Sequence, residues 1–301
     1  MTAASSPVWP RGTEVTGRWH GRRYVVERLI GEGANGRVYL VRGERGIFAM
    51  KVASGSLDLQ AEINALLALQ VDGGMDPYLL DADDACVEGS DPVCFYIMKY
   101  IRGAAVTDYL AGRGPDWFGL VAMRLLERLR DLHAKGYIFG DLKRDNVLVG
   151  EHGRVELVDF GGVTRKGAAV RQFTELYDRG YWHAGGRKAD EAYDLFAFAV
   201  LCIQCTDPRK ELEAAARRIP PQRRSPARLK EMLARCAMRP AHKALIRDIL
   251  DGKTTATDVA LERWRRAMLA QASPAPVPGW MKGALAASAT LLAATLVWTF
   301  L

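Results

Sequence analysis

The chain has 301 residues, enough for one large two-lobed domain or two small domains. Its 49% hydrophobic and 26% charged residues are typical of a folded globular protein and exclude wholesale disorder. The net charge of +7 favours an anionic partner but does not choose among a nucleotide, an anionic membrane and nucleic acid. The five cysteines form no disulfide framework, and Cys202 and Cys205 fall in an apolar run, so we expect core thiols in a reducing compartment.

The first part of the chain predicts a small, mostly antiparallel sheet with one helix. After an N-terminal extension (residues 1–19), residues 24–52 read as three strands, with a glycine-rich turn after the first and a tight turn after the second. Residues 56–70 repeat apolar side chains at helical spacing. Two more strands surround a loop and end in "CFYIMKYI". These elements make up a predicted N-terminal lobe over residues 20–101.

The second part predicts a mainly helical lobe over residues 102–268. The run "WFGLVAMRLLERLRDLHAKG" carries leucines on one face and ends at Gly136, a residue type suited to a helix terminus. A loop and the string "RVELVDFGG" follow, then a buried helix over about 190–205 and arginine-rich helices to about residue 269. The whole is therefore an α+β, two-lobed fold.

The C-terminal end predicts a membrane anchor. Residues 269–279 are a proline-rich linker, and no charged residue interrupts Gly283–Leu301, about 28 Å as a helix. Lys282 flanks this stretch, so we expect residues 280–301 to cross the cytoplasmic membrane once, with the preceding domain in the cytoplasm. The alternative is a buried C-terminal helix. Gly283 and Ala287 form a small-xxx-small pair that could support a homodimer.

Four sequence elements, in order, answer the needs of phosphoryl transfer. The first is "GEGANGRV", whose Gly31, Gly33 and Gly36 would let backbone N–H groups approach phosphates. Strand-like residues flank it on both sides, which argues against a dinucleotide-binding turn. The second is Lys51, which would point under this loop, with Glu62 on the next helix as its candidate carboxylate partner.

The third and fourth elements supply an acid–base group and metal ligands. Asp141, Lys143 and Asn146 are spaced D-x-K-x-x-N, and Asp159 follows 18 residues after Asp141 in "VDFGG". Asp141 would accept the proton of an attacking hydroxyl, and Lys143 would neutralise the moving phosphoryl group. Asn146 and Asp159 would supply hard oxygen ligands to Mg²⁺.

Residues 20 to about 268 resemble the eukaryotic-like serine/threonine protein kinases of bacteria, through "GEGANGRV", "AMK", "GDLKRDN" and "DFG". The resemblance implies use of ATP and Mg²⁺ and phosphorylation of protein substrates, including the chain itself. It further implies nucleotide contacts by Lys51 and Glu62 and by Ile30, Gly31, Gly33, Gly36, Val38, Ala49, Met98, Tyr100 and Leu148. Asp194 in "YDLFAFAV" matches the aspartate that opens the long buried helix of that family.

Three departures from the family pattern bear on activity and its control. Gly140 replaces the arginine that commonly binds a phosphorylated activation loop, so we expect activity without that phosphate and tolerance of alanine at Thr164 or Thr174. Phe139 replaces a histidine and is predicted to stack with Phe160. "GYWHAGG" (180–186) replaces the usual Ala-Pro-Glu, and only 11 residues separate Lys51 from Glu62, which leaves their pairing open.

The sequence thus predicts a membrane-anchored serine/threonine protein kinase of the type without the Arg-Asp pair. Two alternatives remain: a small-molecule kinase like the aminoglycoside phosphotransferases, and a catalytically idle nucleotide-binding scaffold. The segment "RRIPPQRRSPARLK" (217–230) carries six basic residues, read as a solvated loop or as a contact with the anionic leaflet. It lacks an aromatic stacking platform, so nucleic-acid binding is not expected.

Overall fold

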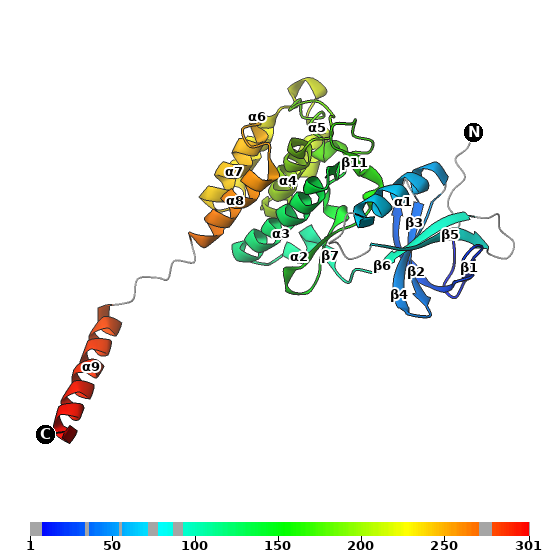
Figure 1. Ribbon diagram of the computed structural model, residues 1–301. Coiled ribbons are helices and arrows are strands. Elements are labelled where there is room, and N and C mark those ends of the chain that lie inside the picture. The colour runs from blue at the N-terminus through cyan, green and yellow to red at the C-terminus, as the bar shows by residue number, and fades with distance from the viewer. Residues whose placement is uncertain are drawn as a thin grey trace.

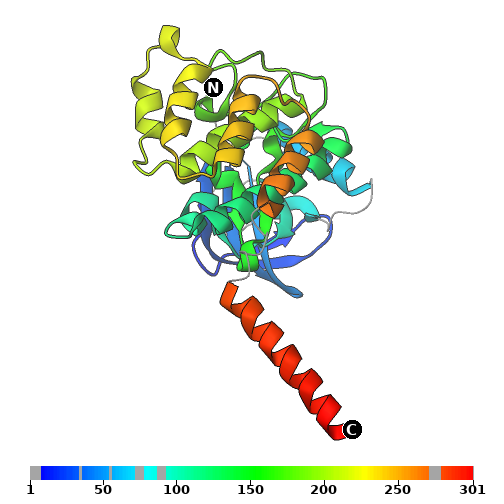
Figure 2. The same cartoon turned by 90° about the vertical axis from the view of Figure 1, so that its left-hand side faces the viewer.

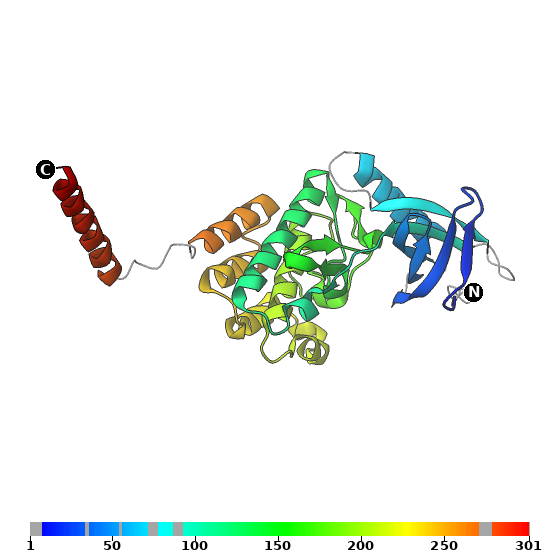
Figure 3. The same cartoon turned by 90° about the horizontal axis from the view of Figure 1, so that it is seen from below.

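The computed structural model describes residues 8–33, 36–53, 56–71, 78–86, 93–270 and 279–300. A β-rich N-terminal lobe and a helical C-terminal lobe lie next to each other, and a separate helix lies clear of both (Figures 1 and 3). The predicted α+β, two-lobed architecture is confirmed.

The N-terminal lobe is a closed barrel of antiparallel strands in the order β1-β2-β3-β4-β6-β5. The strands are β1 (Glu14–Gly17), β2 (Arg23–Gly33), β3 (Gly36–Gly43), β4 (Gly46–Val52), β5 (Leu79–Cys86) and β6 (Val93–Lys99). The strands expected over residues 24–52 are thus present. Helix α1 (Ser56–Val71) follows β4 and lies on the side of the barrel that faces the C-terminal lobe (Figure 1).

Strand β1 closes the barrel, which the sequence did not suggest. The sequence pattern places residues 14–17 in an N-terminal extension, but in the structure β1 pairs with β2 on one side and with β5 on the other. Val15 on β1 is buried in the barrel core, and Trp9 packs on Tyr39 with ring centroids 5.6 Å apart. Burial of two such side chains stabilises the pairing by several kcal/mol, at roughly 1.5–3 kcal/mol each. Residues 9–17 are therefore a structural part of this lobe.

The C-terminal lobe is built from helices around a central one, α4. Its helices are α2 (Val106–Leu110), α3 (Pro115–Ala134), α4 (Glu191–Thr206), α5 (Leu212–Arg218), α6 (Pro226–Arg235), α7 (Pro240–Leu250) and α8 (Thr257–Leu269), joined by 3₁₀ turns η1 (Arg144–Asn146), η2 (Glu151–Gly153), η3 (Phe160–Gly162), η4 (Glu175–Tyr177) and η5 (Pro221–Arg223). Figure 2 looks onto the helices near the end of this lobe. The long helices match the sequence expectation, with boundaries within two or three residues.

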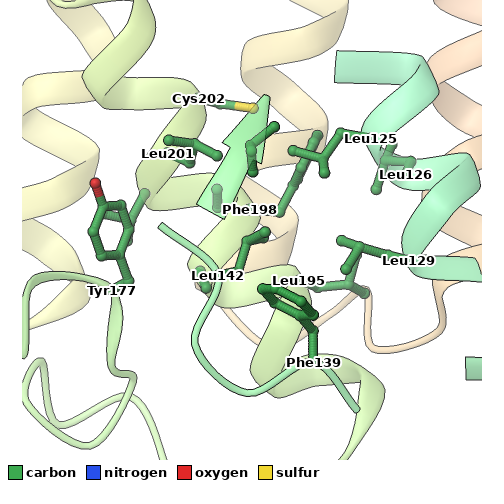
Figure 4. Close-up of a cluster of buried hydrophobic side chains, with 14 of the residues drawn as sticks. Leu125, Leu126, Leu129, Phe139, Leu142, Tyr177, Leu195, Phe198, Leu201 and Cys202 are labelled. Atoms are coloured by element: carbon green, nitrogen blue, oxygen red, sulfur yellow. The ribbon is translucent and has the colours of Figure 1, made fainter. Parts of the chain in front are cut away.

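The core of this lobe follows from apolar patterning. Leu125, Leu126 and Leu129 of α3 are buried against α4, where Leu195 and Phe198 meet them (Figure 4). Helix α4 is apolar on nearly all sides, as its sequence requires of a helix enclosed by others. It begins at the N-cap Asp190, whose carboxylate accepts the Tyr193 backbone N–H at 2.9 Å. Cys202 and Cys205 lie in this helix, and burial raises the pKa of the Cys205 thiol to about 12, consistent with inert core thiols.

Two small sheets fix the loops between the lobes. Strands β7 (Ala104–Ala105), β9 (Val147–Val149) and β10 (Val155–Leu157) form one sheet, and β8 (Tyr137–Ile138) pairs with β11 (Thr164–Arg165) in the other. Residues 139–146, here called the Asp141 loop, therefore leave β8 and enter β9 at fixed points. Residues 159–190 start just after β10 and return to α4. Both segments are held at the face that the barrel covers.

Helix α9 (Gly279–Phe300) is the apolar segment that the sequence singled out. Its span Gly279–Thr299 has a mean hydropathy of 1.4, and none of its most apolar window is buried. By length and composition it is able to cross a membrane. The expected linker falls mostly on residues 271–278, which lie outside the described residues.

Candidate active site

Lys51 lies at the centre of a buried charge cluster under the barrel. Its Nζ is 2.7 Å from Glu62 Oε2 on α1 and 2.7 Å from Asp159 Oδ1 on the C-terminal lobe. Tyr96 on β6 donates its hydroxyl to the second oxygen of Glu62 at 2.7 Å. The Lys51–Glu62 contact that the sequence left open is thus made, despite the short separation in the chain, because α1 begins only a few residues after β4 ends.

The electrostatics of this cluster keep the lysine charged. Burial alone would lower the pKa of Lys51, but the two carboxylates outweigh it and raise the pKa of the ammonium. Burial would likewise raise the pKa of Asp159, and the Lys51 ammonium outweighs it, so that the pKa of this carboxyl is lowered. Lys51 therefore links the two lobes as a cation between two anions.

The Asp141 loop places its polar groups around one carboxylate. Asp141 Oδ2 accepts Lys143 Nζ at 2.6 Å, and Oδ1 accepts the Thr174 hydroxyl at 2.8 Å. Asn146 donates its side-chain amide to the Asp141 backbone carbonyl at 2.9 Å. Asp141 and Asn146 are both buried, and Lys143 is partly exposed. The carboxylate is thus fixed in orientation by its own loop and by the 159–190 segment.

Asp194 anchors the backbone of this loop. Its side chain is fully buried at the start of α4 and accepts the backbone N–H groups of Phe139 at 2.7 Å and Gly140 at 2.9 Å. His133 Nε2 lies 2.8 Å from the same carboxylate, while His133 Nδ1 lies 2.7 Å from the Thr257 hydroxyl. Because a buried carboxylate needs several partners to offset desolvation, these contacts fix where the Asp141 loop begins.

A backbone contact brings the segment that carries Asp159 to Asn146, the other predicted metal ligand. Asp159 has a left-handed backbone (φ 62°), and the Val158 N–H donates to the Asn146 carbonyl at 3.0 Å. Among the described residues, no group of three His, Cys, Asp or Glu could hold a metal alone. One carboxylate and one amide oxygen suit Mg²⁺, which takes its other ligands from phosphates and water. The donor set therefore fits a magnesium-bound nucleotide.

Most of the predicted nucleotide-contacting residues lie on strands β2, β3, β4, β6 and β9. In the pairing of β2 with β3, Gly31 lies opposite Val38 and Gly33 lies opposite Gly36. Gly36 has φ +131°, and a Cβ there would lie 2.2 Å from the Val52 carbonyl oxygen, so only glycine fits. The remaining ones are Ile30 on β2, Ala49 on β4, Met98 on β6, Tyr100 just after β6, and Leu148 on β9. Ala49 and Met98 are register partners.

Phe139 packs as the sequence predicted. Its ring meets Phe160 edge-on, with centroids 5.8 Å apart, and Phe160 in turn contacts Tyr78 at 4.9 Å. Leu66 of α1 belongs to the same buried cluster. Because the Phe139 backbone N–H is bonded to Asp194, this apolar column connects α1 to α4 without any polar side chain at position 139. A phenylalanine side chain at this position needs no hydrogen-bond partner of its own.

Gly140 occupies a position that a larger residue would strain. Its φ is +82°, and a Cβ there would lie 2.7 Å from the Gly162 carbonyl oxygen. The 159–190 segment thus lies directly on the backbone of the Asp141 loop at this point. No arginine side chain extends from this position, and the approach of the two backbones replaces it.

The end of the 159–190 segment is held by ion pairs that sequence reasoning missed. Asp178 is buried and binds Arg187 at 2.7 Å, the Tyr193 hydroxyl at 3.0 Å and two backbone N–H groups. Arg179 forms a two-point contact with Asp190, the N-cap of α4. No motif in the sequence marks Asp178 for this role, because its partners lie nine and fifteen residues away at no regular spacing.

The structure places the two threonines considered as regulatory positions in different surroundings. Thr164 is buried in β11, and its hydroxyl donates to the Gly162 carbonyl at 3.0 Å. The Thr174 hydroxyl contacts Asp141 itself. Removal of the Thr174 hydroxyl would therefore change the surroundings of the Asp141 carboxylate, and tolerance of alanine there is no longer expected.

Comparison with known proteins agrees with this geometry. The family model described as "Protein kinase domain" matches residues 24–223. The chain belongs to the protein kinase domain family.

Individual members of this family are similar to the chain over part of their length. The chain is 41% identical over 196 residues to the serine/threonine-protein kinase YabT of Bacillus subtilis, which covers 64% of this chain and 58% of YabT. It is 26% identical over 201 residues to mouse serine/threonine-protein kinase PAK 1, covering 61% of this chain and 35% of that protein. The granulovirus kinase PK-1 of Cydia pomonella shares the fold, with a TM-score of 0.61, 17% identity, and coverage of 80% of this chain and 93% of that one.

Proposed function

We propose that this chain transfers the terminal phosphoryl group of ATP to serine or threonine hydroxyls of proteins, including its own, and that α9 anchors it in the cytoplasmic membrane. The observation that carries the proposal is the convergence of Lys51, Asp141, Asn146 and Asp159 from three separate segments: β4, the Asp141 loop and the start of the 159–190 segment. None of the four side chains points away from this site into solvent.

In the proposed mechanism, Asp141 orients the acceptor hydroxyl and takes its proton. Its carboxylate is buried and already accepts one hydroxyl, that of Thr174, at 2.8 Å. Lys143, 2.6 Å from the same carboxylate, would neutralise charge that develops on the transferred group. Because both side chains belong to one short loop bonded to Asp194, their geometry is set before substrate arrives.

Lys51, Asn146 and Asp159 would hold the magnesium–nucleotide. Magnesium, when bound, would neutralise part of the negative charge of the phosphates. Asp159 and Asn146 would be its protein ligands, and Lys51, kept charged by Glu62, would hold the phosphates. The β2–β3 glycines would cover the phosphates, with Val38, Ala49, Met98 and Leu148 around the base.

The proposed enzyme does not depend on a phosphorylated loop. Gly140 lacks the guanidinium that would bind such a phosphate, and Asp178 with Arg187 and Arg179 with Asp190 already hold the 159–190 segment. These ion pairs join residues within the segment and to α4, so they require no modification.

The membrane anchor rests on α9. Leu285, Leu291 and Leu292 are each more than 60% exposed. Exposure of so much apolar surface along a helix of 21 residues is unfavourable in water. Trp280 and Trp298 are exposed near its two ends, where interfacial aromatic residues are common. A homodimer through Gly283 and Ala287 remains a prediction. Full-length chain should resist carbonate extraction from membranes, and a chain that ends at residue 270 should be released.

Radiolabel transfer tests the phosphotransferase proposal. The full-length chain in detergent, given Mg²⁺ and labelled ATP, should label itself and a generic protein, and Asp141→Asn should abolish both. Asp145→Asn is the matched control, since Asp145 is four residues along, is largely exposed and, in the described part of the chain, forms an ion pair with Arg144 alone. Nucleotide binding without transfer would favour the idle scaffold, and label found on a small molecule would favour the small-molecule kinase.

A further inference from the structure

The surface that precedes α6 carries an unbalanced positive charge. Residues 217–224 contain Arg217, Arg218, Arg223 and Arg224 and no acidic residue. Within the described residues, none of these arginines has a carboxylate partner, whereas Arg228 and Lys230, just beyond, are paired with Glu231 and Asp251. The first three are exposed. The four together are called the arginine cluster below.

The arginine cluster contacts the 159–190 segment. Tyr181, in the 159–190 segment, donates its hydroxyl to the Ala216 carbonyl at 3.1 Å, and the Arg224 guanidinium lies 3.8 Å from the Tyr181 ring centroid. Figure 1 shows α5 beside this segment. The cluster thus continues the surface on which residues 174–182 lie.

A second set of contacts joins α5 to the Asp141 loop. Arg144, three residues after Asp141, is 3.5 Å from Glu213 of α5, and Gln204 donates to the same carboxylate at 2.8 Å. Tyr177 accepts the Arg144 N–H at 3.3 Å and donates to Gln204 at 2.6 Å. Arg217 follows Glu213 by one helical turn. A path of roughly 20 Å, or about six extended residues, therefore leads from Asp141 to the cluster.

We infer that the arginine cluster binds an acidic segment of the protein substrate, about four to eight residues from the acceptor serine or threonine. This inference rests on the proposed phosphotransferase function and adds the class of substrate. Four guanidinium groups that have no carboxylate partner among the described residues, on the surface that leads to Asp141, match a run of glutamate or aspartate better than a neutral or basic segment. The anionic leaflet and nucleic acid are the competing anions.

Peptide kinetics with the full-length chain in nanodiscs of neutral lipid test the inference. Three serine peptides would carry four glutamates, four glutamines or four lysines within positions four to eight from the serine. One set would have these residues on the N-terminal side of the serine and a second set would have them on the C-terminal side. The glutamate peptide on one side should have a KM at least tenfold below that of the glutamine peptide. Arg217→Glu with Arg218→Glu should remove this preference and improve the lysine peptide, with kcat for the glutamine peptide unchanged.

The matched control is Arg235→Glu with Arg247→Glu, the same charge change at exposed arginines of α6 and α7 that also lack carboxylate partners among the described residues. It should keep the preference. Equal KM values for the three peptides in the wild type would overturn the inference and leave the kinase proposal intact. If the wild type transfers no phosphate to any peptide, the kinase proposal fails, and fluorescence anisotropy of the labelled glutamate peptide decides the inference separately.

Two further results would assign the cluster to another anion. Loss of the glutamate preference when phosphatidylglycerol replaces the neutral lipid would place the arginines on the membrane surface. A larger effect of the α5 substitutions on binding of a 20-nucleotide DNA strand than on the glutamate peptide would assign them to nucleic acid. Either result would overturn the inference.

Discussion

Gly140 is where the chain departs most clearly from its family, and Gly140→Ala tests why. The backbone there has φ +82°, and an alanine Cβ would lie 2.7 Å from the Gly162 carbonyl oxygen, closer than such atoms come in folded proteins. Two destabilising effects would follow, one from the left-handed backbone and one from the contact. The second effect would push the Asp141 loop and the 159–190 segment apart.

Gly136 separates the two effects. It has φ +78°, nearly the same backbone, but a Cβ there would meet nothing within 4 Å. Gly136→Ala should therefore lower the free energy of unfolding by the backbone effect alone, about 1–2 kcal/mol. Gly140→Ala should lower it by about 2–5 kcal/mol, since overpacking against a backbone atom adds about 1–3 kcal/mol to the backbone effect.

Urea unfolding of the full-length chain in detergent measures both changes, and radiolabel transfer measures their effect on the site. Gly140→Ala should reduce transfer at least tenfold, because Asp141 follows directly, whereas Gly136→Ala should reduce it little. If Gly140→Ala is no more destabilised than Gly136→Ala, the backbone contact with Gly162 does not restrict position 140, and the account of this departure is wrong.

Three other outcomes follow from the site and the core. Thr174→Ala should lower kcat/KM about tenfold through loss of a hydrogen bond to a charged group, and Thr174→Ser should restore it; an unchanged Thr174→Ala rate would refute the contact. Glu62→Gln should lower stability in urea by about 3 kcal/mol, since it removes one of the two carboxylates around buried Lys51, whereas exposed Glu32→Gln should not. Burial lowers the pKa of His242 to about 4, so protonation of this histidine favours the unfolded chain. The free energy of unfolding should therefore fall by about 3 kcal/mol from pH 6.5 to pH 4. His242→Phe, which keeps the ring stacked on Trp264, should make the free energy of unfolding less dependent on pH over this range.

The parts of this fold that the sequence could predict are those with local patterns. The strands over residues 24–52 and the helices α1, α3 and α4 follow from apolar spacing and turn residues, and the motif order placed Lys51, Asp141, Asn146 and Asp159 in one constellation. The resemblance to a family added the lobe arrangement, which periodicity alone does not give. The roles of the site residues remain predictions for the transfer assay.

What could not be predicted depends on contacts between distant segments. Strand β1 has only four residues, and its place in the barrel depends on pairing with β5, nearly seventy residues later. Asp178 is one acidic residue among many until folding brings Arg187 and Tyr193 around it. Only 11 residues separate Lys51 from Glu62, which is fewer than is usual for this pair in the family. The two side chains nevertheless form their contact, because α1 begins only a few residues after β4 ends.

The position of the activation segment is fixed here by other contacts than in kinases with an Arg-Asp pair. Three residues contribute to this difference: Phe139, Gly140 and Asp178. A phosphate-binding arginine next to Asp141 makes the position of the activation segment depend on modification. Here that contact is replaced by backbone packing at Gly140, an apolar column through Phe139, and a buried Asp178 carboxylate with four donors. Since none of these interactions includes a group that phosphorylation creates, control of such an enzyme would have to act elsewhere. We expect such control to act on access of an acidic substrate to the arginine cluster or, if α9 anchors the chain as proposed, on the position of the kinase domain relative to the membrane.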